Sequence, residues 1–209
     1  MNSRILDPEK IEAKSFEIIE QEMAGHGFGP QEWTVVRRII HATADFDLGR
    51  SVIFHQEAIR SGIEAIRRAC PVVADVQMVQ VGISRISCSR FGNRVYCSIG
   101  DRDVARRAKA AGLTRAIISM RKARKKLQGG IVAIGNAPTA LLEVIRLVRE
   151  EQIIPALIIG VPVGFVSAAE SKEELSKLDI PYITNRGRKG GTPVAVATVN
   201  ALLGLSAQS

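Results

Sequence analysis

The stretch IVAIGNAPTA, residues 131–140, decides the fold of this 209-residue chain. Its four apolar residues, Ile131–Ile134, lie between two glycines, which is typical of a buried β-strand. A glycine-containing loop follows, and Pro138 suits the first turn of a helix that we expect to end near Gln152. Strand, glycine loop and helix in this order form the unit from which parallel sheets are built.

Two later units repeat this order. Their predicted strands are Ala156–Ile159 and Tyr182–Thr184, their loops Gly160–Gly164 and Arg186–Gly191, and their helices Ser171–Lys177 and Pro193–Leu203. Three such units in succession predict an α/β fold, a three-layer α/β/α sandwich with a mainly parallel sheet, formed as a single domain over residues 1–209. Because the carboxyl ends of parallel strands meet at one edge, the three loops should converge where such sheets bind ligands.

The first part of the chain carries helix signals followed by less regular strand signals. The first predicted helix starts at Leu6-Asp7-Pro8-Glu9 and ends before Gly25. The second starts at Gly29-Pro30 and ends between His41 and Asp45. The third runs from Gln56 to Ala69. The β-branched residues of Val72–Ile83 predict a buried strand, and Val95–Ile99 predicts another. Two basic helices should follow before Gly130.

Composition excludes several classes of protein. With 46% hydrophobic and 24% charged residues, the chain is globular rather than disordered. Cys70, Cys88 and Cys97 are an odd number without metal-ligand spacing, which disfavours a disulfide scaffold or a zinc site and favours a reducing cytoplasm. The uncharged run Ile153–Ala169 is interrupted by prolines and glycines, and the N-terminus is charged, so we expect neither a membrane span nor a signal peptide.

The net charge of +8 originates in one segment, Arg102–Lys126, which holds ten basic residues and a single acidic one. Solvated faces of two amphipathic helices would explain this excess, and so would an anionic partner. A nucleic acid usually needs aromatic stacking groups or a known module, and this segment contains no Phe, Tyr or Trp. A small ligand with phosphate or carboxylate groups needs no such platform. Composition alone leaves these alternatives open.

Two of the glycine loops carry candidate ligand-binding groups. Arg186, Arg188 and Lys189 stand among three glycines directly before a helix, an arrangement that favours an anion, with an ordinary exposed turn as the alternative. The spacing fits neither a Walker A loop nor a dinucleotide-binding fingerprint. In the loop before Pro138, Asn136 offers a hydrogen bond to a ligand or serves only as a helix cap.

His41 is the candidate for proton transfer among the three histidines. It ends the second predicted helix, where the helix dipole and the nearby carboxylate of Asp45 would favour imidazolium and make His41 a proton donor near neutral pH. A purely structural histidine at a helix end is the alternative. The residues by themselves therefore indicate a protein that binds a polyanion, or an acid–base enzyme that acts on one.

Several long motifs together resemble those of the precorrin-8 methylmutases. They occur in the same order over nearly the whole chain, from about Asp7 to Leu203. The motifs are HATAD (41–45), DVQMV (75–79) with GI (82–83), TR (114–115), IGNAPTAL (134–141), GVPVGFV (160–166) with AESKE (169–173), GRKGG (187–191) and VNALL (199–203). Any one of them would be weak support, whereas several in register are specific.

The resemblance implies an isomerase of cobalamin biosynthesis with a flavodoxin-like fold, which works as a homodimer and needs no added cofactor. Such an enzyme moves a methyl group from C11 to C12 of precorrin-8X or cobalt-precorrin-8 and yields hydrogenobyrinate or cobyrinate. Its catalytic histidine corresponds to His41, which would protonate the macrocycle. Any cobalt would be carried by the substrate, so no metal site is expected in the protein.

A flat apolar ring that bears many carboxylates needs an apolar slot rimmed by cations. The candidates for binding the carboxylates are Arg115, Arg186, Arg188 and Lys189, with Ser15, Thr43 and Asn136 as hydrogen-bonding neighbours. The basic run Arg121–Lys126 matches no motif of the family and is interpreted as a solvated face. The expected partners are a corrinoid polycarboxylate and a second copy of the chain, without nucleic acid or membrane. A non-catalytic tetrapyrrole carrier is the alternative function.

Overall fold

The computed structural model describes residues 7–208, so Leu6 of the predicted first helix lies outside the described residues. Within this range, six strands form one sheet: β1 (Val52–Phe54), β2 (Val72–Ala74), β3 (Val95–Tyr96), β4 (Ile131–Ile134), β5 (Leu157–Gly160) and β6 (Tyr182–Asn185). No helix in the same range is both long enough and apolar enough to cross a membrane.

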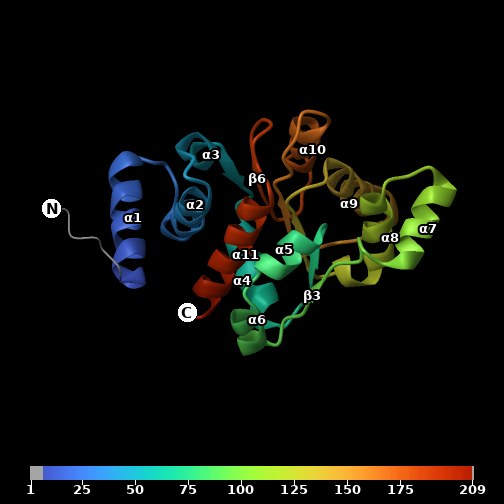
Figure 1. Cartoon of the computed structure of the whole chain (residues 1–209), viewed down its shortest axis with the longest axis horizontal. Helices are drawn as coiled ribbons and strands as arrows, with labels where there is room; N and C mark the ends of the chain where they lie inside the picture. The colour runs from blue at the N-terminus through green and yellow to red at the C-terminus, as the bar shows by residue number, and fades with distance from the viewer. Residues whose placement is uncertain (1–6, 209) are drawn as a thin grey trace.

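Eleven helices accompany the sheet in this part of the chain (Figure 1). They are α1 (Pro8–Glu22), α2 (Pro30–Thr43), α3 (Phe46–Arg50), α4 (Ala58–Arg67), α5 (Gln77–Gly82), α6 (Arg85–Phe91), α7 (Arg102–Ala111), α8 (Arg115–Leu127), α9 (Pro138–Glu151), α10 (Ala168–Leu175) and α11 (Thr192–Ser206). Figure 1 shows α1 at one end of the molecule beside α2, and α7 at the opposite end.

The strand order is β1-β6-β5-β4-β2-β3. All neighbouring strands pair in parallel except β1 and β6, which are antiparallel at one edge. Without that edge strand, the parallel strands follow the flavodoxin-like order, in which the first strand lies between the second and the third. The predicted α/β sandwich with a mainly parallel sheet is confirmed, and the direction of winding reverses between β2 and β4.

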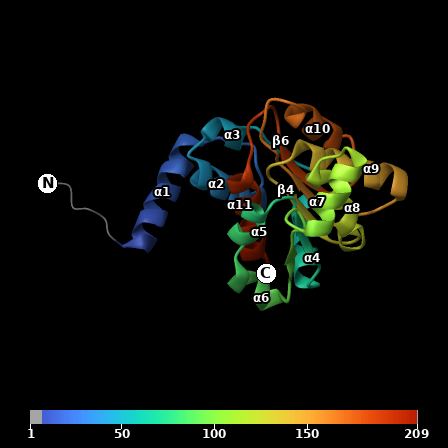
Figure 2. The same cartoon turned by 45° about the vertical axis from the view of Figure 1, so that its right-hand side comes forward.

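Both faces of the sheet are buried, which explains the unbroken apolar runs in its strands. In β4, Ile131 and Ala133 belong to one core, which α2, α4 and α11 complete, whereas Val132 and Ile134 belong to a second core with α8, α9 and α10. Figure 2 shows α2 and α11 on one side of the sheet and α8 and α9 on the other. The loops at the strand ends are therefore held between packed elements.

The three later strand–loop–helix units agree with prediction within three residues at each end. The predicted strand Val72–Ile83 is wrong after Ala74, because α5 begins at Gln77. Packing of α5 on α11, which buries Val79 in the first core, overrides the β preference of this valine-rich segment. The strand predicted for Val95–Ile99 keeps only its first two residues, and β1, α3 and α6 were not predicted because they are too short to show a sequence period.

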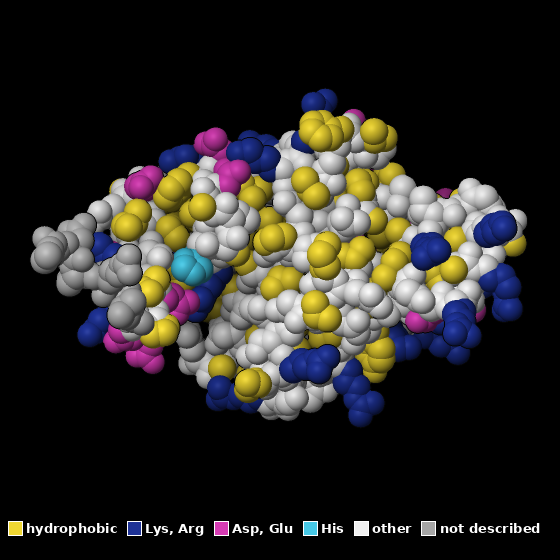
Figure 3. Space-filling view, in the orientation of Figure 1, with side chains coloured by type: hydrophobic (Ala, Val, Ile, Leu, Met, Phe, Trp, Pro, Cys, Tyr) yellow, Lys and Arg dark blue, Asp and Glu magenta, His cyan; other side chains and the backbone are white. Residues whose placement is uncertain are grey.

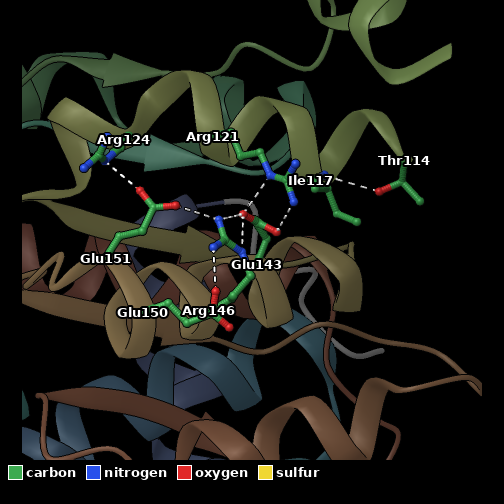
Figure 4. Close-up of polar contacts among 8 residues, drawn as sticks. All are labelled: Thr114, Ile117, Arg121, Arg124, Glu143, Arg146, Glu150 and Glu151. Atoms are coloured by element: carbon green, nitrogen blue, oxygen red, sulfur yellow. Dashed lines mark hydrogen bonds and ion pairs between the residues drawn. The ribbon is translucent and has the colours of Figure 1, made fainter. Parts of the chain in front are cut away.

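A buried carboxylate joins α8 to α9 (Figure 4). Glu143, whose side chain is 5% exposed, accepts hydrogen bonds from Nε of Arg121 at 2.9 Å and from Nη2 of Arg146 at 2.6 Å. The interpretation of Arg121–Lys126 as a solvated face is therefore wrong for Arg121, and Lys122 and Arg124 also pair with carboxylates, of the α7 region and of α9. Lys125 is exposed as expected.

We predict that Glu143→Gln lowers the free energy of unfolding by about 1.5–3 kcal/mol at pH 7, because charge-assisted hydrogen bonds are lost. Burial by itself raises the pKa of the Glu143 carboxyl, but hydrogen bonds from Arg121 and Arg146 outweigh this effect and lower the pKa below 4.5. The stabilisation is therefore present above the unfolded-state pKa and is lost as the pH falls through the folded-state pKa. Urea unfolding over a series of pH values measures both effects.

Glu150→Gln is the matched control, because Glu150 also pairs with Arg146 but is 64% exposed. For this exposed pair we expect a loss of less than about 1 kcal/mol in the free energy of unfolding. Equal losses in the two variants would contradict the role given to Glu143.

Candidate functional site

The loops after β4, β5 and β6 meet at one edge of the sheet, as predicted. A Cβ atom on Gly135, after β4, would lie 2.9 Å from Cα of Thr192 at the start of α11. A Cβ atom on Gly190, after β6, would lie 2.4 Å from the carbonyl oxygen of Val161 in the loop after β5. These close backbone approaches require glycine, so the glycines that suggested ligand-binding loops also allow the loops to pack together.

Asp75 anchors the loop after β4. Its fully buried carboxylate follows β2 and accepts hydrogen bonds from the backbone N–H groups of Gly135, Asn136 and Ala137, at 3.1, 2.8 and 2.8 Å. Burial raises the pKa of the Asp75 carboxyl, and the three hydrogen bonds oppose that rise without cancelling it. The side chain of Asn136 is exposed at this edge. Asp75 was not among the predicted site residues, although a carboxylate directly after an apolar strand is a signal for such an anchor.

A contact between two threonines holds Arg115 near the same edge. Thr114 caps α8 by accepting a hydrogen bond from the N–H of Ile117. Oγ1 of Thr114 also lies 3.2 Å from Oγ1 of Thr139, in the first turn of α9. Arg115, the first residue of α8, is thus placed next to the loop of Asn136 with its side chain exposed.

Lys189 joins the loop after β6 to the segment that follows His41. Its Nζ lies 2.7 Å from Oδ2 of Asp45, and this hydrogen bond raises the pKa of Lys189 and lowers the pKa of Asp45. Asp45 also accepts a hydrogen bond from the N–H of Leu48 at 2.8 Å and so caps α3. The oxygens of Asp45 are therefore occupied by Lys189 and by the cap of α3.

The two arginines of the loop after β6 point to different places. The guanidinium carbon of Arg188 lies 5.8 Å from the ring centroid of Phe165, so this cation stays with the loop after β5. Arg186 instead lines a separate hollow of about 470 Å³ with His26 and Arg50, next to β1. The structure therefore groups Arg188 with the converging loops and separates Arg186 from them.

His41 lies in the last turn of α2, at a hollow of about 560 Å³. The walls come mainly from α2 and α11, and α11 contributes the apolar side chains Pro193, Val196 and Ala197. The His41 imidazole is exposed and packs edge-on against the ring of Phe16 in α1, with 5.2 Å between ring centroids. An imidazole at the wall of an apolar hollow can exchange a proton with a flat apolar ligand bound there.

The hollow is also lined by two cations that were not among the predicted site residues, Arg37 and Arg38. Their guanidinium carbons lie 4.4 and 4.9 Å from the ring centroid of Phe16, and both pair with glutamates of α1. The signal was available, because Thr34, Arg37, Arg38 and His41 occupy positions i, i+3, i+4 and i+7 of one helix and therefore share a face.

Of the predicted site residues, only His41 lines this hollow. The hydroxyl groups of Ser15 and Thr43 donate hydrogen bonds to carbonyl oxygens of their own helices, at Ile11 and Ile39, each over 2.8 Å. These two side chains are therefore occupied within their helices in this structure. No group of three or more His, Cys, Asp and Glu residues between positions 7 and 208 is placed to hold a metal ion.

Helix α11 links the loop edge to the hollow. It begins directly after the glycines of the loop that carries Arg188 and Lys189, and its Pro193 lines the hollow beside His41. In Figure 3, apolar side chains spread over the middle of this face, and Lys and Arg side chains lie around its margins. Such a surface can bind a large ligand that has an apolar body and anionic substituents.

Known proteins match this chain over most of its length. The profile of the family described as precorrin-8X methylmutase matches residues 10–205. A protein of Priestia megaterium named cobalt-precorrin-8 methylmutase is 57% identical over 197 residues, which cover 94% of this chain and 88% of that protein. A precorrin-8X methylmutase of Pseudomonas aeruginosa is 38% identical, with 95% and 96% of the two chains covered.

The fold comparison agrees with the sequence comparison. The crystal structure of a precorrin-8X methyl mutase from Thermus thermophilus matches with a TM-score of 0.89 and 42% identity, over 95% of this chain and 96% of that chain. Profile, relatives and fold agree over nearly the whole length. This chain therefore belongs to the precorrin-8X methylmutase family of isomerases.

Proposed function

We propose that this protein moves a methyl group from C11 to C12 of cobalt-precorrin-8 in cobalamin biosynthesis, with His41 as the proton donor. The observation that carries the proposal is the exposed imidazole at an apolar hollow whose α11 wall begins at the cation-bearing loop edge. The bond between C11 and the methyl group breaks and the bond to C12 forms within one molecule. Because the reaction is an isomerisation, a proton that His41 gives to the macrocycle returns before the product leaves.

The other residues of the site bind and orient the substrate. The apolar face of the macrocycle packs on the α11 wall, which excludes water from it. Arg115, Arg188 and Lys189 bind carboxylates at the loop edge, and Arg37 and Arg38 bind others beside the imidazole. Holding the ring in one orientation against one proton donor is how such a site lowers the barrier to an intramolecular shift.

The sequence identities with the relatives favour a cobalt-containing substrate over a metal-free one. The chain shares 57% sequence identity with a relative named cobalt-precorrin-8 methylmutase, and 38% and 42% with two relatives named precorrin-8X methylmutase. All three relatives are named methylmutases, so no observation favours the alternative of a non-catalytic carrier.

We also propose that the protein acts as a homodimer. Phe165, Val166 and Ile86 are 86%, 81% and 87% exposed, and large apolar side chains left in water are typical of interaction surfaces. In Figures 1 and 2, α1 lies beside α2 and away from the sheet, so its far side is unpartnered within the described chain. A second copy would cover such surfaces and bound the open side of the site.

We predict that His41→Asn lowers kcat about 10²–10⁴-fold, because a positioned proton donor contributes about that factor. The KM and the affinity for the product should change little, since the cations and the α11 wall remain. Steady-state kinetics and product titration by absorbance test this. His55→Asn is the control, because His55 lies beside Tyr182 and Asp179, away from the hollow of His41. Retained turnover in His41→Asn would refute the assigned role.

We predict faster conversion of cobalt-precorrin-8 than of precorrin-8X by the purified protein under anaerobic conditions. Absorbance spectra recorded over time distinguish the cobyrinate and hydrogenobyrinate products from their substrates. Faster conversion of the metal-free substrate would contradict the preference for cobalt. Tight binding of both substrates without conversion would instead support a carrier.

We predict a mass near twice 22.7 kDa in light scattering after gel filtration. Phe165→Asp and Ile86→Asp should each shift the protein towards the monomer, because a carboxylate would be buried at the contact. Ile154→Asp is the control, since Ile154 is an exposed apolar residue in the α9–β5 loop, near Gln128. A monomeric native protein would refute the homodimer.

A further inference from the structure

Lys172 in α10 is a buried cation that the proposed reaction does not use. Lys172 is only 2% exposed, and its side chain lies between α10 and β6. Nζ donates hydrogen bonds to the carbonyl oxygen of Lys189 at 2.6 Å and to Oδ1 of Asn185 at 3.3 Å. The ammonium group therefore points from the helix layer into the base of the loop after β6.

Asn185, which accepts a hydrogen bond from Lys172, also binds this loop. It is buried at the end of β6, and its Nδ2 donates to the carbonyl oxygens of Arg186 at 3.1 Å and Lys189 at 2.8 Å. The amide and the ammonium together bind both ends of the segment Arg186–Lys189. The outward cations of this segment are thereby fixed from its inner side.

The position of Lys172 is unfavourable for a charge. None of the ion pairs among residues 7–208 includes it, and burial lowers its pKa to about 8 from the usual 10.5. Lys172 is protonated at neutral pH, and the folded state bears the cost of the buried charge there. Stability from this group rises only as the pH increases from about 8 to 10.5, where the unfolded chain alone keeps the proton. An apolar residue of similar length would avoid this cost.

Few charged groups lie near the ammonium. Glu173 of α10 and Arg186 line the same small hollow, and both are exposed. Glu174 is taken by Arg149 of α9 and by Lys177. Lys172 thus contacts two oxygens of the loop base and not a carboxylate. This indicates that the ammonium group stabilises the conformation of the loop.

We propose that Lys172 is a positioning residue that holds the loop Arg186–Gly190 in the conformation in which Arg188 and Lys189 face the carboxylates of the substrate. This inference rests on the proposed role of that loop in substrate binding. Lys172 itself does not touch the substrate. Its removal should loosen the loop while it leaves the core of the protein intact.

Limited trypsin digestion of Lys172→Met tests the effect on the loop without substrate. Trypsin cleaves after Arg186, Arg188 and Lys189, so mass spectrometry reports the opening of this segment directly. We expect cleavage there to be roughly tenfold or more faster than in the native protein, because charge-assisted hydrogen bonds are lost. The Tm should stay unchanged or rise. An unchanged cleavage rate would overturn the proposal.

Lys177→Met is the matched control. Lys177 lies just after the same helix, but it is exposed and pairs with Glu174 at 2.6 Å. This variant should show native cleavage rates in the loop and native kinetics. Equal loosening of the loop in Lys177→Met would show that any lysine lost near α10 has the effect, and would overturn the proposal.

Steady-state kinetics connect the loop to the reaction. Lys172→Met should raise KM about tenfold and change kcat less than about twofold, because binding energy is lost equally in the ground and transition states. A lowered Tm with native KM would mark Lys172 as merely structural and overturn the proposal. The double variant Arg188→Ala/Lys189→Ala should raise KM as well. If KM stays native in the double variant, the loop does not bind substrate, and the proposed role of the loop fails. Trypsin digestion of Lys172→Met is done without substrate, so it tests the effect of Lys172 on the loop separately.

Discussion

The loop edge of the site depends on the carboxylate of Asp75, which accepts hydrogen bonds from three consecutive backbone N–H groups. Because β2 and β4 are parallel neighbours, Asp75 after β2 and the loop after β4 lie side by side at the carboxyl edge of the sheet, where the winding reverses. Three consecutive N–H groups turned towards the sheet would be unsatisfied without a buried acceptor. Asp75 supplies it, and the exposed side chain of Asn136 and the start of α9 follow from that fixed loop.

The basic residues of this protein include structural cations and exposed ones. Arg121, Lys122 and Arg124 pair with carboxylates of α9 or of the α7 region and hold helices together. Arg115 and Arg188 project from the loop edge, where they are exposed. The segment Arg102–Lys126, which looks like a single basic patch in the sequence, therefore contains both cations that hold helices together and exposed ones such as Arg115 and Lys125.

The base of the loop after β6 contains a buried cation that is unfavourable for the stability of the folded state. Lys189 is tied to Asp45, and the buried Lys172 holds the loop base at a cost to the folded state. An apolar residue at position 172 would avoid the cost of the buried charge but would remove the hydrogen bonds to the loop base. The buried charge at this position agrees with the proposed role of Lys172 in positioning the loop.

The sequence by itself determined the α/β class, the three regular units after Gly130 and the identity of His41 as the histidine at a helix end, because periodicity and capping are local properties. Only the tertiary structure decided that Val76 to Val81 lies in a turn and helix instead of a strand, since burial against α11 overrides β preference. It also decided the partners of Asp45, Asp75 and Lys172, which lie many residues away along the chain. Local pattern predicts elements, whereas the pairing of buried charges depends on which distant segments the sheet brings together.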